Sequence, residues 1–317
     1  MWAQFEDLTQ HVNFVAVLDL INMGSGYRKA LHDMCGRGAW DSIRFGAMGM
    51  HISGMTLVAG QLQSMPIDKV AELFGMALAV DKPVDGPNAA FMTLSEPSPL
   101  RPLVERLTKV MNETGDILQR GGHASLGAFV LDSARRHFEA NGKALAVPIV
   151  EDLVATFPAF NDRVTFEGEQ IEIHKKAQLL AADLFRHFAN DEPVFRFTDL
   201  DSLTVFADNV LPTALRALGV LQVDADIVAK IEADRELPSG SDDEALLRGM
   251  AVHACERILS TAEAVRQEHI AAAGAEDANG VPLPCDAAVL DFFLFTAGKR
   301  PDIRSMKRHS TRDTVFY

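Results

Sequence analysis

The sequence predicts a mainly α-helical protein that carries one small β-hairpin. Apolar residues recur at helical spacing along most of the chain, most clearly over residues 100–119. A single segment, residues 164–173, combines β-branched and aromatic residues on either side of a Glu-Gly pair, which is typical of a short hairpin. No internal repeat, low-complexity tract or linker interrupts this pattern. We therefore expect a single domain over residues 1–317, with room for two lobes of about 1–100 and 101–317.

In the N-terminal third, glycines and prolines mark the ends of the expected elements. Residues 11–35 carry an apolar stripe that Gly24-Ser25-Gly26 interrupts, so we expect two short elements around a turn. Pro66 and Asp68 are typical of a first helical turn and predict a helix from residue 66 to about residue 80. The polar, proline-containing stretch over residues 81–90 predicts a loop.

The remaining two thirds read as a series of amphipathic segments separated by turn residues. The predicted helices cover residues 100–119, 125–140, 147–156, 175–189, 225–236, 242–268 and 286–297. A further short helix is expected just after Asp208, and the tail from residue 298 is expected to be irregular and basic.

The charge of the chain disfavours several classes of partner. There are 30 Lys and Arg residues against 44 Asp and Glu residues, which gives a formal net charge of -14. This charge repels the phosphate backbone, so binding to duplex nucleic acid is disfavoured.

No apolar run approaches the ~18 residues of a membrane span, and the acidic start is unlike a secretory leader. We expect no membrane association and a cytoplasmic location, with the nucleus as an alternative.

Neither cysteines nor glycine loops indicate a metal or a cofactor. Cys35, Cys255 and Cys285 are far apart in sequence and form no Cys-x-x-Cys pair. The Gly-Ser-Gly of residues 24–26 lacks the spacing of a phosphate loop or of a dinucleotide fingerprint. We therefore expect no cofactor and no bound metal.

Asp208 is the strongest candidate for a catalytic residue. It ends the apolar run that contains Phe206, and it precedes Leu211-Pro212, where proline is compatible with the first turn of a helix. One interpretation is that Asp208 only caps this helix, and the residues alone favour that interpretation. The other is that a carboxylate beside an aromatic ring stabilises a developing cation or activates water.

Three further residues extend this candidate site. Asp291 lies next to Phe292 in an apolar helix, and a buried aspartate needs either a structural partner or a ligand. Asp199 precedes Asp208 by nine residues, and Lys175 opens the helix after the hairpin. Carboxylates beside aromatic rings are typical of a glycosidase-like site, and a lysine can hold a monophosphate.

Several blocks of the chain resemble the queuosine salvage protein family, the queuosine 5'-phosphate N-glycosylase/hydrolases. The blocks are MNETGDIL from Met111, FPAFNDRVTFEGEQIEIHKKAQLLAADLF from Phe157, DLDSLTVFADNVLPTALRALGVL from Asp199, LLRG from Leu246, LDFFLF from Leu290 and the final RDTVFY. They span most of residues 105–317. A weaker block, VLDLIN, begins at Val17.

The resemblance implies a fold similar to the helix-hairpin-helix DNA glycosylases. It also implies hydrolysis of the N-glycosidic bond of queuosine 5'-monophosphate, or of a close nucleotide or nucleoside analogue, with release of the base queuine. The family's catalytic aspartate falls on Asp208. The expected substrate-binding residues are Phe206, Asp291, Phe292, Asp199, Lys175, Asp19 and Asn22. Among these, phosphate binding by Lys175 is our own inference from its charge.

Two departures from the family pattern keep a second function open. Gly24-Ser25-Gly26 stands where an aromatic-rich stretch is usual, and Thr296 stands in place of a second acid on the late helix. The altered residues 24–26 motivate, as the alternative, a non-catalytic binder of a modified nucleoside, and both changes leave the exact substrate open. A DNA glycosylase fits less well, because its substrate is the duplex that the net charge disfavours.

Overall fold

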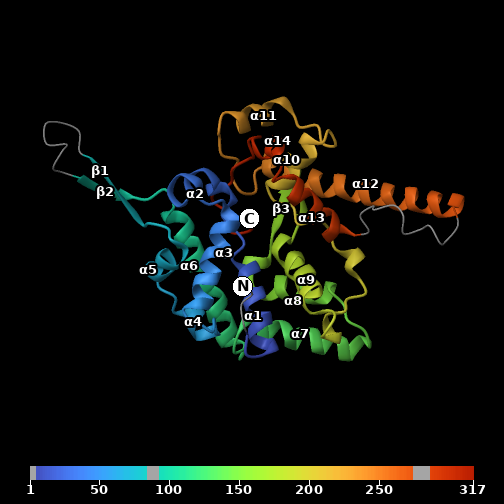
Figure 1. Ribbon diagram of the computed structural model, residues 1–317, viewed down its shortest axis with the longest axis horizontal. Coiled ribbons are helices and arrows are strands. Elements are labelled where there is room, and N and C mark those ends of the chain that lie inside the picture. The colour runs from blue at the N-terminus through green and yellow to red at the C-terminus, as the bar shows by residue number, and fades with distance from the viewer. Residues whose placement is uncertain (1–4, 84–92, 274–285) are drawn as a thin grey trace. The chain divides into compact units, whose positions relative to one another are not determined.

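A computed structural model describes residues 5–83, 93–273 and 286–317. The chain forms two compact units, one of residues 1–132 with 314–317 and the other of residues 133–313 (Figure 1). The division falls within helix α7 (Leu126–Asn141), whereas the two lobes allowed for by the sequence meet near residue 100.

The first unit consists mainly of helices. They are α1 (Leu8–Leu20), α2 (Arg28–Cys35), α3 (Ala39–Ile52), α4 (Ala59–Gln63), α5 (Ile67–Phe74), α6 (Arg101–Arg120) and the first part of α7, with the 3₁₀ turn η1 (Ser25–Tyr27) between α1 and α2. Helix α6 packs against α4 and α5, and α3 packs against α1, α2 and α5. The expected turn at residues 24–26 is present, because Gly24 has a φ of 99° and leads into η1.

A strand pair in this unit corrects two predictions. The helix predicted over residues 66–80 ends at Phe74, because Gly75 has a φ of 63° and stops it in the left-handed conformation. Strand β1 (Ala79–Pro83) then pairs antiparallel with β2 (Thr93–Pro97). The hairpin at residues 164–173 is therefore not the only one, and the predicted loop over residues 81–90 begins with a strand. Residues 84–90 of that loop lie outside the described part of the chain.

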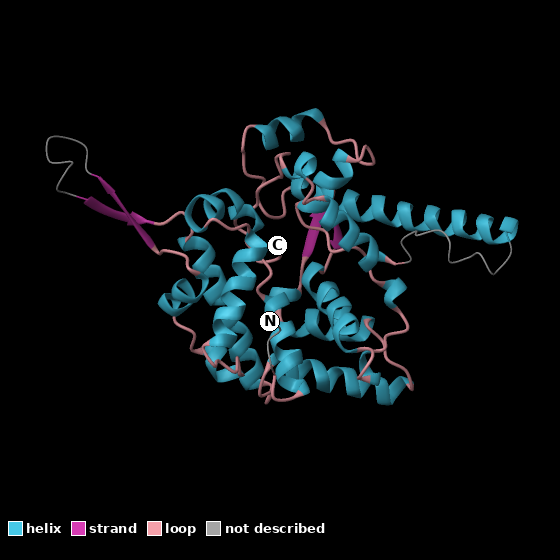
Figure 2. Ribbon diagram, in the orientation of Figure 1, coloured by secondary structure: helices cyan, strands magenta, loops and turns pink. Residues whose placement is uncertain are grey.

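The second unit holds the later helices and a second strand pair (Figure 2). Its helices are the end of α7, α8 (Val147–Thr156), α9 (Lys175–Phe188), α10 (Val210–Ala217), α11 (Ala225–Glu232), α12 (Asp242–Ala273), α13 (Ala287–Ala297) and α14 (Pro301–Arg304). Its strands are β3 (Arg163–Phe166) and β4 (Glu169–Glu172), and its 3₁₀ turns are η2 (Pro158–Phe160), η3 (Pro193–Phe195) and η4 (Leu200–Ser202). The mainly α-helical class with a small hairpin is confirmed.

The predicted hairpin has the turn that its sequence favours. Glu167 and Gly168 connect the strands with φ values of 51° and 84°. Positive φ at both turn residues matches the twist of the flanking strands. Val164 pairs with Ile171 in the antiparallel register, and both pack beside Ala207 in one small apolar cluster. The hairpin thus packs against Ala207, the residue that precedes Asp208.

Helix α10 lies in an apolar core of this unit and packs against both α12 and α13. Val210, Leu211 and Leu215 of α10 are buried with Leu290 and Leu294 of α13. Burial of such side chains supplies most of the stabilising free energy of a domain. The start of α10, where Asp208 lies, is therefore anchored by packed helices. In the part of the chain that the structure describes, no helix is long and apolar enough to cross a membrane.

Replacement of Gly115 by alanine should destabilise the first unit. A Cβ atom at Gly115 of α6 would clash with the backbone nitrogen of Gln63 and lie 2.6 Å from the carbonyl oxygen of Ala59, both in α4. We expect Gly115→Ala to lower the free energy of unfolding by about 1–3 kcal/mol, as overpacking does, when measured by urea denaturation. Gly249→Ala in α12 is the control, since the nearest atom there is Ile171 Cδ1 at 3.7 Å. It should raise stability by up to about 1 kcal/mol, and equal losses in the two variants would contradict the prediction.

Candidate active site

Asp208 lies in an irregular segment, residues 203–209, between η4 and α10. Because the segment has no helix or strand of its own, several of its backbone groups need partners from elsewhere. Gln178 on α9 supplies the first of them. Its Oε1 accepts the N–H of Thr204 at 2.7 Å, and its Nε2 donates to Thr204 Oγ1 at 2.9 Å. The segment is thus fixed to α9 at its start.

The carboxylate of Asp208 caps helix α10. Its Oδ1 accepts the N–H of Val210 at 2.6 Å and, at a longer 3.4 Å, the N–H of Leu211. Asp208 thus satisfies N–H groups at this helix start from the position before the N-cap residue, Asn209. Within the described residues, Oδ2 of Asp208 accepts no hydrogen bond, and the side chain is half-buried. Oδ1 accepts hydrogen bonds from the helix, whereas Oδ2 accepts none from the described residues. Asp208 can therefore bond the helix start and still take part in a reaction.

Asp291 on α13 is joined directly to the same segment. Its Oδ1 accepts the backbone N–H of Phe206 at 2.9 Å. Phe206 is buried, with 5% of its surface exposed, and precedes Asp208 by two residues. The structure therefore brings together three residues that the sequence placed in one site: Phe206, Asp208 and Asp291.

The environment of Asp291 raises its pKa to about 7. Burial is the main cause, because it disfavours the charged form, and the negative charge of Asp208 adds to it. The N–H of Phe206 and the cations Lys175 and Arg186 lower the pKa in part. Near neutral pH the carboxyl of Asp291 is thus present both as an acid and as a carboxylate, and can donate or accept a hydrogen bond.

Helix α9 places two cations within electrostatic range of Asp291. Lys175 is the first residue of the helix and is 5% exposed. Arg186 pairs with Asp183, and its Cζ lies 5.9 Å from the ring centroid of Phe292. Arg186 was not predicted, although it follows Lys175 by eleven residues and therefore lies on the same face of α9. That spacing is the signal that could have found it.

The two predicted aromatic residues differ in exposure. Phe206 is buried, whereas 58% of Phe292 is exposed. An exposed ring with a cation beside it offers a face for stacking a planar base. Thr296, the departure on the same helix, is also exposed.

Asp199 has a structural partner that the sequence did not reveal. Its two carboxylate oxygens accept the N–H groups of Ala146 and Val147, at 2.7 and 3.1 Å. These are the first backbone groups of α8, so Asp199 satisfies a helix N-terminus. Contact between Asp199 and a substrate stays a prediction.

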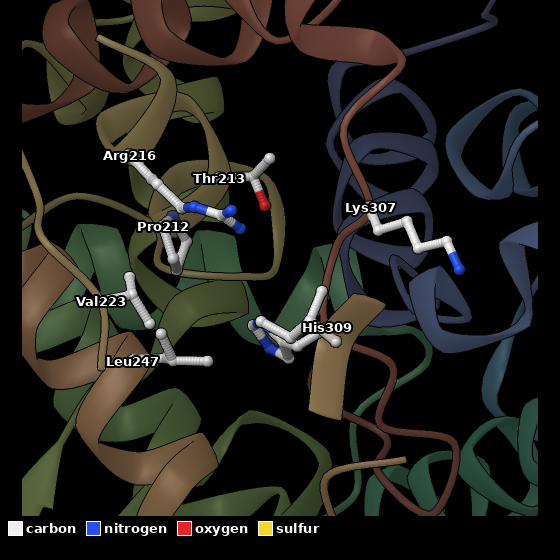
Figure 3. A pocket seen from close by; sticks show the side chains of 8 residues that line it. Pro212, Thr213, Arg216, Val223, Leu247, Lys307 and His309 are labelled. Carbon is white, nitrogen blue, oxygen red and sulfur yellow. The ribbon is translucent and has the colours of Figure 1, made fainter. Parts of the chain in front are cut away.

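A hollow beside α10 does not contain the predicted site residues (Figure 3). It is lined by Pro212, Thr213, Arg216, Val223, Ile231, Leu247, Lys307 and His309. The space is about 10 Å³, whereas sites for small ligands occupy roughly 300–1,000 Å³. It can hold a water molecule at most and is too small for a ligand of nucleotide size. Among the described residues, no cluster of three His, Cys, Asp or Glu side chains has the arrangement of a metal site.

The chain also matches a known protein family. The sequence model of the queuosine salvage protein family matches residues 84–317. The chain belongs to the queuosine salvage protein family. The match includes the whole second unit, with Asp208, Asp291 and both α9 cations, and it begins after Asp19 and Asn22.

Relatives in this family come from distant organisms. A queuosine 5'-phosphate N-glycosylase/hydrolase of Sphaerobacter thermophilus is 28% identical over 216 residues, which is 68% of this chain and 58% of the relative. Proteins of the same name from Nematostella vectensis and Mus musculus are 29% and 27% identical, over 70% and 68% of this chain and 61% and 59% of their own lengths. The chain thus spans less than two thirds of the length of these relatives.

Asp19 and Asn22 belong to the first unit of this family member. Asp19 is fully buried in α1, and Asn22 is half-buried just after the end of that helix. The N–H of Asn22 donates to the carbonyl of Asp19 at 3.2 Å. Substrate contact by these two residues stays a prediction.

Proposed function

We propose that this protein hydrolyses the N-glycosidic bond of queuosine 5'-monophosphate, or of a close analogue, and releases queuine. The observation that carries the proposal is the joining of Asp208 and Asp291 through Phe206, with a positively charged helix beside them. The printed names of the relatives support the same reaction. Enzymes that break glycosidic bonds commonly use two carboxyl groups, whose different environments give them different pKa values.

In the proposed reaction, the bond between ribose C1' and N9 of the base breaks. The bonding electrons leave with the base, and positive charge develops on the ribose. Asp208 stabilises that charge directly or activates the attacking water. The hydroxyl of water bonds to C1', a proton is delivered to the departing base, and the products are queuine and ribose 5-phosphate.

Asp291 is proposed to assist the departing base. A 7-deazapurine has no N7 that could be protonated, so help must come from hydrogen bonds to its pyrimidine edge. A carboxyl group with a pKa of about 7 can donate such a bond in its acid form. Phe206 and Phe292 are proposed to contact the plane of the base, and Lys175 the 5'-phosphate.

The proposed partner is therefore a small nucleotide and no duplex nucleic acid, which agrees with the net charge of -14. The proposed reaction needs no cofactor or metal. The proposed location of the protein is the cytoplasm or the nucleus.

Direct turnover tests the proposal. The protein is incubated with queuosine 5'-monophosphate, and free queuine is measured by mass spectrometry. We expect release by the wild type, and slower release from queuosine without its phosphate. No release would overturn the proposed hydrolysis. Tight binding without turnover would instead identify a binder of a modified nucleoside.

A further inference from the structure

Arg248 of α12 is a buried cation with a complete set of directed partners. Only 1% of its surface is exposed. Its Nη1 donates to Asp162 Oδ1 at 3.0 Å and to Glu244 Oε1 at 3.2 Å, and its Nη2 donates to Asp162 Oδ2 at 2.5 Å. Its Nε donates to the backbone carbonyl of Ala207 at 3.0 Å. The guanidinium thus connects a buried ion cluster to the residue that precedes Asp208.

Asp162 fixes the other side of this cluster. Its carbonyl oxygen accepts the N–H groups of Ile173 and His174, at 3.0 and 2.9 Å, and its Oδ2 accepts the N–H of Lys175 at 3.3 Å. These N–H groups lie just after the hairpin and at the start of α9. Asp162 is fully buried, so the partner of Arg248 is itself held by hydrogen bonds to two other elements.

The carbonyl of Ala207 belongs to the peptide that leads directly into Asp208. Ala207 is fully buried, so its carbonyl needs a partner, and the irregular segment provides none by regular pairing. Arg248 satisfies this carbonyl, while Asp291 satisfies the N–H of Phe206 one residue earlier. The backbone on the N-terminal side of Asp208 is therefore oriented by two charged side chains from different helices.

We propose that Arg248 is a positioning residue, which holds the Asp208 carboxylate in its working place through the Ala207 carbonyl. The role rests on the proposed function of Asp208. The bond to Ala207 distinguishes it from a purely structural role. A buried ion cluster gives little net stability compared with apolar packing, whereas the Nε bond holds the carbonyl of the peptide that leads into Asp208. A displacement of about 1 Å in a catalytic group can lower a rate by about 100-fold.

The test replaces Arg248 by lysine. Lysine keeps the positive charge, but it has no planar fork with which to pair Asp162 and hold Ala207 at once. We expect kcat for queuine release to fall by about 10- to 100-fold in Arg248→Lys, with KM within about twofold of the wild-type value.

Asp152→Asn is the control for lost stability. Asp152 accepts hydrogen bonds from Ser133 and Arg136, at 2.5 and 2.6 Å, and pairs with His137 at 2.9 Å, between α7 and α8. It is outside the Asp208 segment, so its loss should weaken folding while kcat stays within about twofold. Should Arg248→Lys fail to fold, the triple variant Asp162→Asn, Glu244→Gln and Arg248→Met removes the three charges of the cluster together and should show the same fall in kcat.

Two kinetic outcomes overturn the inference. One is a wild-type kcat in a folded Arg248 variant, and the other is a rise in KM alone. If the wild type releases no queuine, the proposed function fails, and ¹³C NMR titration of Asp291 then tests the positioning by itself. Because the charge of Asp208 helps to raise that pKa to about 7, displacement of Asp208 should lower it in Arg248→Lys and leave it unchanged in Asp152→Asn. An unchanged Asp291 pKa in both variants would overturn the positioning role.

Discussion

Asp208→Asn should remain folded and release queuine about a thousandfold more slowly than the wild type. The amide oxygen of asparagine can still accept the N–H of Val210, which Asp208 Oδ1 accepts at 2.6 Å, and asparagine caps helices as well as aspartate does. The substitution therefore removes the negative charge and keeps the cap. The measurements are kcat by mass spectrometry of queuine and the midpoint of thermal unfolding.

Asp224→Asn is the matched control for this variant. Asp224 caps α11, and its Oδ1 accepts the N–H of Asp226 at 2.8 Å. The control removes the same charge from another helix start, so its kcat should stay within about twofold of the wild-type value. If Asp208→Asn kept more than about a tenth of the wild-type rate, Asp208 would be a helix cap and no catalytic residue.

Most helices could be predicted because their apolar spacing and their end signals agree. Residues 147–156 were predicted as a helix and form α8 (Val147–Thr156), and residues 100–119 lie within one residue of α6. Strand β1 could not be predicted, because Ala79–Pro83 contains aspartate, lysine and proline, which are rare in strands. It pairs antiparallel with β2, which follows it closely along the chain. The likeness to helix-hairpin-helix DNA glycosylases stays a prediction.

The site could be predicted only where a residue's type already suggested its chemistry. Asp208, Asp291 and Phe206 stood out as acids and a ring in apolar surroundings, and the structure joins them. Arg248 could not be assigned a role, although the block LLRG contains it, because its contacts with Asp162 and Ala207 span 86 and 41 residues. Hydrogen bonds over such separations leave no periodic signal in a sequence.

Compared with the wild type, the Asp291→Asn variant should become more stable as the pH rises. The folded-state pKa of Asp291, about 7, exceeds its ordinary value of 3.8. The folded protein therefore keeps a proton that the unfolded chain has lost, and stability falls as pH rises toward 7. From about pH 5.5 to about pH 8.5 the wild type should lose about 2 kcal/mol of unfolding free energy through this group. Asparagine cannot ionise, so the variant should avoid that loss in urea denaturation at the two pH values.

The same substitution tests the role of Asp291 in the reaction. If its acid form donates a hydrogen bond to the departing base, wild-type kcat should fall as pH rises through about 7, and Asp291→Asn should be about 100-fold slower with that pH dependence removed. Asp286→Asn is the control, because Asp286 caps the same helix by accepting the N–H of Val289 at 2.8 Å. It should keep the wild-type pH profile. A wild-type kcat that instead rises through neutral pH would mean that the carboxylate of Asp291 is the active form, and that the proton for the base comes from water or from another group.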